Sequence, residues 1–197
     1  MAEENISAVL LASGLSRRMG GQDKLLLKYK GKTLIERAVE LLDSLPCREK
    51  IFVTTAQRIS GMAVPQTVSA VINHNPQIGQ SESLRLGLGA ATGQWYLFLN
   101  ADQPRLTLAG LKPIFELAGR NTDKIIYPQI NGNPCTPVLF PARFRAELLE
   151  QTGDFGGRAV RMAHPQFCLA FEAKNPQDFM DIDCLEDYLA LCKPDRA

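Results

Sequence analysis

The chain has 197 residues, of which 45% are hydrophobic, and this length is enough for one domain with a full core. Its 22 basic and 21 acidic residues leave a formal net charge of +1, which argues against a general nucleic-acid surface because such a surface needs a basic excess. No stretch approaches the roughly 18 consecutive apolar residues of a membrane span, and the opening Met-Ala-Glu-Glu-Asn is acidic where a signal peptide would be basic. We therefore expect a cytoplasmic protein with a small-molecule partner, and neither nucleic acid nor a membrane as partner.

The predicted elements alternate between strands and helices. Apolar runs of strand length lie at residues 7–11, 50–54, 69–72 and 95–99. Helical periodicity covers residues 33–45, 83–91 and 108–117. The first helix has the strongest signal because Thr33 and Glu36 have the spacing of a capping box. The alternation predicts an α/β domain with a mainly parallel sheet.

Pro and Gly residues punctuate the chain after Asn121 and separate two short apolar runs, at residues 124–127 and 138–140. We predict that these runs form a strand pair that closes over the site. They give no reason to expect a second domain, so residues 1–197 are expected to form a single one.

The five cysteines are odd in number and have no C-x-x-C spacing; they are Cys47, Cys135, Cys168, Cys184 and Cys192. This pattern indicates neither a disulfide framework nor a zinc site. We expect ordinary thiols, most of them buried packing residues.

Residues 10–27 are the most informative segment and read L-L-A-S-G-L-S-R-R-M-G-G-Q-D-K-L-L-L. An apolar strand opens here into a turn of small residues, whose backbone N–H groups can approach phosphate oxygens. Arg17, Arg18 and Lys24 add positive charge. The segment suits a triphosphate at the carboxyl end of the sheet, where open α/β folds bind ligands. Taken alone, it could equally be a solvated loop with a few basic residues.

Two other segments only imitate nucleotide-binding motifs. Gly31-Lys32-Thr33 ends like a P-loop, but the first glycine of that motif would have to stand where the chain has Leu26. Residues 87–93 imitate a dinucleotide fingerprint, yet they precede a strand instead of following one. We interpret these glycines as a site of close helix packing.

Acidic residues at two further places are candidate metal ligands. Asp102 follows the apolar strand at 95–99, and Mg²⁺ is usually bound through one or two carboxylates plus substrate phosphates. The alternative is that Asp102 caps the turn made by Pro104. Near the end of the chain, Asp181 and Asp183 lie on one side of an extended segment, and Asp183 with Glu186 also has the spacing of a helix N-cap.

Several motifs together resemble one enzyme family. Residues 11–20 with K-L-L at 24–26 are similar to the L-A-A-G-x-S-x-R-M-G…K-L-L signature of the molybdenum cofactor nucleotidyltransferases. G-Q-S-E-S-L-R at residues 79–85 resembles a stretch of the cytidylyltransferase branch, as do D-Q-P at 102–104 and D-I-D-C-L-E-D-Y at 181–188. These matches are collinear and span nearly the whole chain.

The resemblance implies a Rossmann-like nucleotidyltransferase fold, a mainly parallel sheet with helices on both faces, and CTP and Mg²⁺ at the carboxyl ends of the strands. By position, the nucleotide-contacting residues would be Leu11, Ala12, Ser13 and Gly14, with Gln80 and Ser81 near the base or ribose. Arg18 and Lys24 would bind phosphates, while Asp102 and Asp183 would hold Mg²⁺. Arg18, Lys24 and Asp102 are the expected catalytic residues.

The reaction that the resemblance implies is attack by the terminal phosphate of the molybdopterin cofactor on the α-phosphorus of CTP, with release of pyrophosphate. A phosphate with a second pKa of about 6 is already largely ionised at neutral pH, so no general base is required. We accordingly expect His74 and His164 to be loop residues. A molybdenum hydroxylase would be the recipient of the product.

Position 13 favours CTP over GTP, because the guanylyl branch usually has a glycine there and a serine side chain leaves less room for a purine. The acceptor side departs from the family pattern: Thr136 stands in place of a histidine and Phe155 in place of a lysine. Arg158 and Arg161 either bind an acceptor phosphate or belong to a solvated helix face.

Two alternatives follow from this departure. One is transfer to another phosphorylated acceptor, such as a sugar phosphate. The other is a nucleotide-binding partner of a molybdenum enzyme that delivers cofactor without chemistry, although such a protein would have little need of metal-binding carboxylates.

Overall fold

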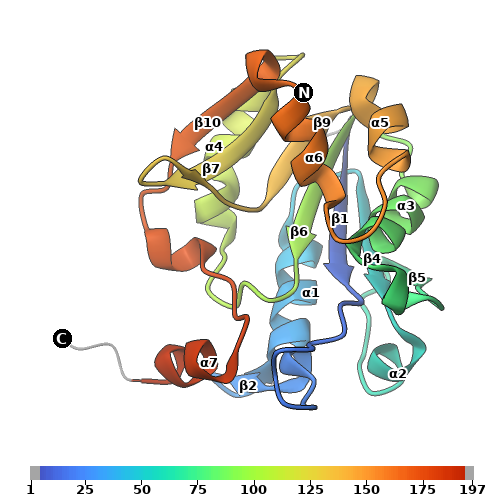
Figure 1. The fold of residues 1–197 in the computed structure, drawn as a ribbon, viewed down its shortest axis with the longest axis vertical. Helices are drawn as coiled ribbons and strands as arrows, with labels where there is room; N and C mark the ends of the chain where they lie inside the picture. Colours follow the sequence, from blue (N-terminus) through green and yellow to red (C-terminus); the bar gives the residue numbers. More distant parts are fainter. Residues whose placement is uncertain (1–4, 194–197) are drawn as a thin grey trace.

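The computed structural model describes residues 5–193 and contains an eight-stranded mixed sheet in the order β10-β7-β9-β6-β1-β4-β5, with β8 beside β7 (Figure 1). Its strands are β1 Ile6–Ala12, β4 Glu49–Thr54, β5 Ser69–Ile72, β6 Trp95–Asn100, β7 Ile125–Ile130, β8 Asn133–Pro134, β9 Val138–Pro141 and β10 Cys168–Glu172. A separate small ribbon pairs β2 Lys28–Tyr29 with β3 Lys32–Thr33. The strand β1 pairs in parallel with both β4 and β6 and so lies inside the sheet.

Helices cover both faces of this sheet. They are α1 Leu34–Ser44, α2 Ala56–Ile59, α3 Gln80–Ala90, α4 Leu108–Ala118, α5 Arg145–Leu149, α6 Gly156–Ala163 and α7 Leu185–Leu191. Short 3₁₀ helices are η2 Lys24–Leu26, η3 Pro76–Ile78, η4 Ala142–Phe144, η5 Pro165–Phe167 and η6 Pro176–Phe179. Apolar residues of α1 and α4 form one core with the sheet, and those of α3, α5 and α6 form the other. The predicted α/β class is therefore confirmed. Over residues 5–193, no helix is both long enough and apolar enough to cross a bilayer.

The helix α1 forms where its capping box predicts it. The Thr33 backbone N–H donates to Glu36 Oε2 at 2.7 Å, and the Glu36 N–H donates to Thr33 Oγ1 at 3.3 Å. These bonds satisfy two donors that a helix N-terminus would otherwise leave without partners. Leu34 and Leu42 are fully buried against the sheet, and the helix ends shortly before Pro46.

Gly87 allows α3 to approach β1 closely. A Cβ built at this position would lie 2.3 Å from Val9 Cγ1, nearer than real side chains ever come. The predicted close helix packing is confirmed here. This close contact holds α3 beside β1 and therefore beside the loop that leaves β1.

The region after Asn121 differs from its prediction. The strands β7 and β9 do pair, through Ile126 and Leu139, but both are members of the main sheet. The prediction that they close over the site is therefore wrong. Residues 125–128 of β7 and all of β9 are buried in the sheet, and Val138 and Phe140 of β9 line a cavity together with the connection between the two strands. The cysteines are free as expected, but only Cys47 is buried, so the expectation that most are buried is wrong too.

Glu49 supports a prediction about acid stability. Its carboxylate accepts hydrogen bonds from Ser7 Oγ at 2.5 Å and from the Thr92 N–H at 2.8 Å. Burial by itself would raise the Glu49 pKa, but the bonds from Ser7 and Thr92 outweigh it and lower the pKa. Because the Glu49 pKa is lower in the folded than in the unfolded protein, the carboxylate stabilises the fold at pH values above its ordinary pKa of 4.5. This stabilisation is lost as the pH falls through the folded-state pKa.

We expect Glu49→Gln to destabilise the protein by about 1 kcal/mol at pH 7 and by much less at pH 3, since folding no longer depends on the ionised carboxylate there. Urea unfolding at the two pH values measures the difference. Glu150→Gln, at an exposed position, serves as the control and should change little at either pH. An equal loss from Glu49→Gln at both pH values would contradict the prediction.

Candidate active site

The loop that leaves β1, residues 13–23, is called the signature loop below. It begins at the carboxyl end of a central strand, beside the segment that leaves β6, and the segment before α7 lies at the same edge (Figure 1). Ser16, Gly20 and Gly21 adopt positive φ angles of 50°, 60° and 91° in this loop. Such angles cost little for glycine but are strained for serine, so the loop needs fixed partners to hold its shape.

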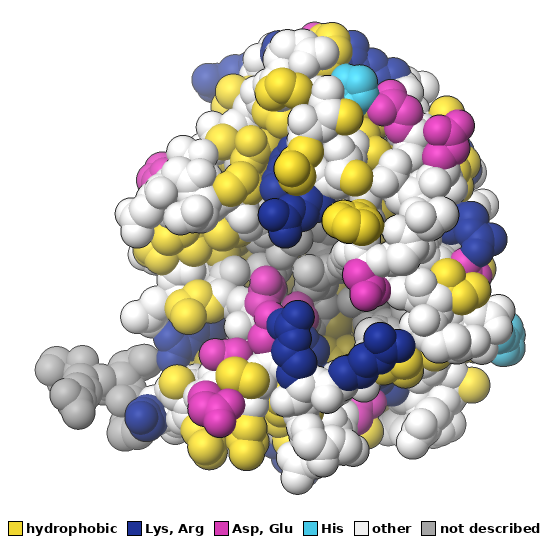
Figure 2. Space-filling view, viewed as in Figure 1, with side chains coloured by type: hydrophobic (Ala, Val, Ile, Leu, Met, Phe, Trp, Pro, Cys, Tyr) yellow, Lys and Arg dark blue, Asp and Glu magenta, His cyan; other side chains and the backbone are white. Residues whose placement is uncertain are grey.

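A cavity of about 490 Å³ opens along this loop. The predicted site residues that line it are Leu11, Ala12, Ser13, Gly14, Arg18, Lys24, Gln80, Asp102 and Asp183. Figure 2 shows that side chains of both charge signs gather around a hollow in the middle of this face. Segments far apart in the sequence therefore meet as the motifs predict.

Lys24 lies at the centre of the charged groups. Its Nζ donates to Asp102 Oδ2 at 2.6 Å, to the Ile182 carbonyl at 2.7 Å and to Asp183 Oδ1 at 3.4 Å. Burial by itself would lower the Lys24 pKa, but the charges and hydrogen bonds of Asp102 and Asp183 outweigh it and raise the pKa. The amine is therefore an ammonium at every physiological pH.

Asp102 and Asp183 are suited to hold a divalent cation together. Asp102 Oδ1 is buried and has no hydrogen-bond partner among the described residues, which leaves a lone pair for a further cation. In residues 5–193, no group of three or more His, Cys, Asp and Glu side chains is arranged to hold a metal by itself. Two carboxylates completed by substrate phosphates are the donor set that Mg²⁺ commonly uses.

Asp183 is not the cap of α7, so that alternative is wrong. Cys184 is the N-cap, and the Asp187 side chain completes the capping box by accepting from the Cys184 N–H at 3.0 Å. The Asp183 carboxylate instead accepts from Arg18 Nη1 at 3.0 Å and faces Lys24. The Arg18 and Asp183 side chains are 76% and 54% exposed, so their ion pair is weak and leaves Arg18 available to an anion.

Asp181 lines a different cavity from Asp183. Its carboxyl group is close enough to those of Asp102 and Asp183 to feel their negative charges, and desolvation together with these charges raises its pKa to about 7. Gln103 fixes the adjacent backbone, because its buried Nε2 donates to the carbonyls of Phe179 and Thr136. The two aspartates thus face two neighbouring compartments.

The second cavity has a volume of about 480 Å³ and shares Leu11, Gln80, Asn100 and Asp154 with the first. Its other lining residues include Thr136, Phe155, Arg158, Arg161 and Asp181. The shared walls make the two cavities neighbours along one cleft, one beside the signature loop and one beside α6.

The buried surroundings of the signature loop contain residues that sequence reasoning missed. Asn73 Nδ2 donates to Ser13 Oγ at 3.1 Å and to Ser83 Oγ at 3.2 Å, and the two hydroxyls also contact each other. Ser81, predicted to lie near the base or ribose, does not line the cavity: it is only 4% exposed, and its N–H donates to the Gly153 carbonyl. Ser81 lies on the inner side of α3, so a contact of its side chain with a nucleotide stays a prediction.

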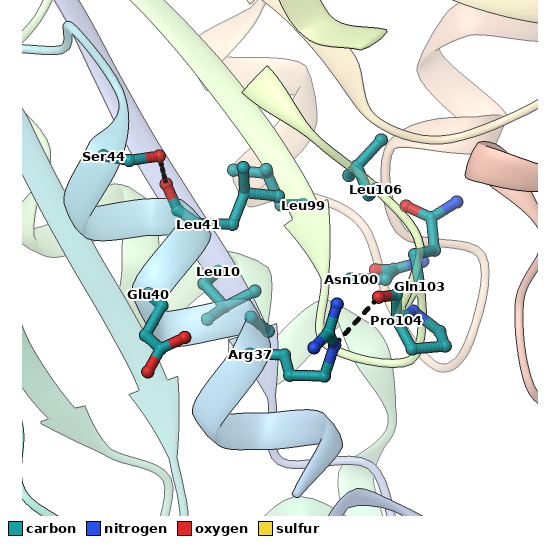
Figure 3. Close-up of a pocket in the computed structure, with 11 residues that line it drawn as sticks. Leu10, Arg37, Glu40, Leu41, Ser44, Leu99, Asn100, Gln103, Pro104 and Leu106 are labelled. Atoms are coloured by element: carbon teal, nitrogen blue, oxygen red, sulfur yellow. Dashed lines mark hydrogen bonds between the residues drawn. The ribbon is translucent and has the colours of Figure 1, made fainter. Parts of the chain in front are cut away.

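A smaller cavity of about 240 Å³ lies on the α1 side and contains none of the predicted site residues (Figure 3). Leu10, Leu41 and Leu99 form part of its wall, and Arg37 Nε donates to the Pro104 carbonyl at 3.1 Å across it. This contact joins α1 to the segment that carries Asp102.

The fold and the loop after β1 define a nucleotide-binding α/β protein. Residues 8–167 match the MobA-like NTP transferase domain family, and the chain belongs to this family. It is 28% identical over 196 residues to nicotine blue oxidoreductase of Paenarthrobacter nicotinovorans, an alignment covering 94% of this chain and 96% of that protein. It is 32% identical over 114 residues to a molybdenum cofactor guanylyltransferase of Pseudomonas aeruginosa, covering 58% of this chain and 57% of that relative.

Solved structures share the whole architecture. A nucleotidyl transferase from Methanothermobacter thermautotroptrophicus aligns with a TM-score of 0.78 at 26% identity and 95% coverage of both chains. The manganese complex of Rv0371c from Mycobacterium tuberculosis aligns with a TM-score of 0.73 at 20% identity, covering 95% of this chain and 98% of that one. At that identity, the second likeness is one of fold.

Proposed function

We propose that this protein transfers CMP from CTP to the terminal phosphate of the molybdenum cofactor and releases pyrophosphate, with Mg²⁺ held by Asp102 and Asp183. The observation that carries the proposal is the single cavity lined by the signature loop, Lys24 and both aspartates. The name of the Pseudomonas relative supports the acceptor, and the manganese in the Mycobacterium structure supports a divalent metal.

The chain's own residues act mainly by placement and charge. Backbone N–H groups of the signature loop and the cations of Arg18 and Lys24 bind the triphosphate and stabilise the charge that develops on pyrophosphate. When bound, Mg²⁺ supplies Lewis-acid neutralisation of the phosphate oxygens. Asp102 and Asp183 are the residues that would hold it, and Lys24 fixes both carboxylates.

No residue is needed as a general base. The acceptor phosphate is already ionised at neutral pH, and its oxygen forms the new bond to the α-phosphorus as the bond to pyrophosphate breaks. His164 lies at the end of α6 and bonds to Glu147 Oε2 at 2.6 Å, away from the cavity beside the signature loop. His74 does not line that cavity either. Alignment of the two reactants therefore carries the chemistry.

The second cavity is the proposed acceptor compartment. Arg158 and Arg161 line it and give it two cations for an acceptor phosphate. Phe155 is 69% exposed at the same place and offers a ring face to a planar molecule. Its wall is shared with the nucleotide cavity, which supports direct transfer between the two.

Ser13 supports CTP as the donor. Ser13 is part of the cavity wall although it is only 2% exposed, and its hydroxyl ties that wall to Asn73 and Ser83; a glycine there would remove these bonds and let the wall yield to a larger base. The Pseudomonas relative is a guanylyltransferase by name, so GTP is the competing donor.

Calorimetric titration of CTP, GTP, ATP and UTP in the presence of Mg²⁺ tests the donor. We expect CTP to bind at least about tenfold more tightly than GTP, and Ser13→Gly to reduce this preference. Transfer of radiolabelled CMP to molybdopterin, compared with sugar phosphates, tests the acceptor. Preferred binding of GTP would overturn the role given to Ser13, and CTP binding without pyrophosphate release would favour a delivery protein.

The full-length similarity to nicotine blue oxidoreductase supports a second candidate, a reductase. A lysine between two carboxylates fits polyphosphate and metal binding, and this arrangement favours the transferase. Oxidation of NADH or NADPH by an added redox dye, without any nucleotidyl transfer, would replace our proposal by this one.

A further inference from the structure

Arg58 is a buried cation outside every motif that the sequence singles out. It comes from α2, which follows β4, and only 6% of the residue is exposed. A buried guanidinium is costly unless its donors are all used. The hydrogen-bond partners of Arg58 therefore indicate its structural role.

The Arg58 side chain donates hydrogen bonds to the signature loop and to Ala12, the residue before it. Nη1 donates to the Ala12 carbonyl at 2.5 Å, and Nη2 donates to the Gly14 carbonyl at 2.6 Å. Nε and Nη2 also form a two-pronged pair with the Asp23 carboxylate, at 2.6 and 2.9 Å. One side chain thus binds the first residues of the loop and its last residue.

Asp23 transmits this contact to Lys24. Its Oδ1 accepts from the Leu25 N–H at 3.1 Å and so caps η2, the short helix that begins with Lys24. Ser16 Oγ donates to the same oxygen at 3.4 Å, and it accepts from the Lys24 N–H at 3.2 Å. The position of Lys24 is therefore tied to the loop through Asp23 and Ser16.

We propose that Arg58 and Asp23 are a positioning pair that sets the distance between the phosphate-facing N–H groups of the signature loop and the Lys24 ammonium. Neither residue needs to touch the nucleotide. The planar fork of arginine is required because it bonds two carbonyls and both oxygens of one carboxylate at once, which a lysine ammonium does not. This inference rests on the proposed function where the test measures CMP transfer. A second measurement, proteolysis of the signature loop, does not depend on that function.

The test compares Arg58→Lys and Asp23→Asn with wild-type protein in CMP transfer. We expect Arg58→Lys to lower kcat about 10- to 100-fold while the KM for CTP changes only a few-fold, because misalignment is felt most in the transition state. The double variant should lose no more than Arg58→Lys alone, since the two residues act as one unit. If Arg58→Lys fails to fold, the milder Asp23→Asn carries the test.

A matched control separates positioning from general stability. Arg145 donates to the Leu88 and Ala91 carbonyls and to Tyr96 Oη, at the end of α3 that is farthest from the cavity. Arg145→Lys makes the same chemical change there, and we expect lower thermal stability with unchanged kcat. An equal fall in kcat in both arginine variants would overturn the proposal.

Trypsin provides the readout that needs no nucleotide. Arg17 and Arg18 lie in the signature loop, and cleavage after them reports how often the loop opens. We expect Arg58→Lys and Asp23→Asn, but not Arg145→Lys, to be cut there at least about tenfold faster than wild type. Wild-type cleavage rates in both Arg58→Lys and Asp23→Asn would overturn the proposal. Absence of nucleotidyl transfer in wild-type protein would instead contradict the proposed function and leave this test in force.

Discussion

Replacing Asp102 by alanine is expected to abolish nucleotidyl transfer while leaving the fold intact. The carboxylate has one oxygen on Lys24 Nζ and one buried oxygen without a partner, and metal assistance is worth several kcal/mol in phosphoryl-type reactions. We therefore expect kcat/KM for CTP to fall at least about 10³-fold. Steady-state kinetics with Mg²⁺, together with thermal unfolding, measures both parts of the prediction.

Asp102→Asn refines this test because it keeps a hydrogen-bond acceptor for Lys24 but removes the negative charge. We expect it to be nearly as inactive as Asp102→Ala and closer to wild type in stability. Asp123→Ala, in an exposed loop, is the matched control and should keep full activity. Nucleotide transfer that survives in Asp102→Ala with Mg²⁺ present would show that the metal assignment is wrong.

Much of the fold follows from local sequence signals. The capping box at Thr33, the apolar runs of β1, β4, β5 and β6, and the tight glycine contact at Gly87 are all local patterns that the structure confirms. The placement of β7 and β9 was missed because the order of strands in a sheet depends on long-range pairing, which a short apolar run does not encode. A short apolar run predicts that a strand forms, but it does not predict which strands lie beside it in the sheet.

In the candidate site, too, some residues could be predicted from local sequence and others could not. The motif residues that line the cavity beside the signature loop could be proposed because they lie at the ends of strands, in the loops that follow them or at the starts of helices. Arg58 and Asn73 could not, since a lone arginine or asparagine in a polar segment usually belongs to the solvated surface. Gln80 and Ser83, the neighbours of Ser81 in the motif, line the cavity, whereas the helical period turns Ser81 itself inward, a difference that the motif alone does not show. Supporting contacts of this kind become visible only once the elements are packed.

Replacing Lys24 by methionine is expected to reduce kcat/KM for CTP by about 10²- to 10³-fold, the usual cost of losing one donor to a developing negative charge. Methionine keeps the apolar length of the side chain and removes the charge. Lys32→Met is the control, because Lys32 forms only an exposed ion pair with Glu40. Unchanged kinetics in Lys24→Met would contradict the placement of the triphosphate.

The pH dependence of the wild-type protein bears on the same residue. The raised pKa of Lys24 means that its ion pairs contribute fully below the ordinary value of 10.5 and are lost only as pH rises through the higher folded value. We therefore expect no loss of Lys24 function between pH 6 and about 9. If kcat/KM of the wild-type protein fell as the pH rose within this range, and Lys24→Met showed no such fall, the expectation would be contradicted.

Metal affinity in Lys24→Met should change in the opposite direction from activity. In the wild-type protein the ammonium is hydrogen-bonded to both Asp102 and Asp183, so a cation that binds these carboxylates has to share them with Lys24. Without that charge, we expect Mn²⁺ to bind several-fold more tightly in the absence of nucleotide, measured by electron paramagnetic resonance. Tighter metal binding with slower transfer would mean that Lys24 acts on the triphosphate rather than merely holding the metal ligands. Weaker metal binding would mean that its main role is to hold the two carboxylates in place.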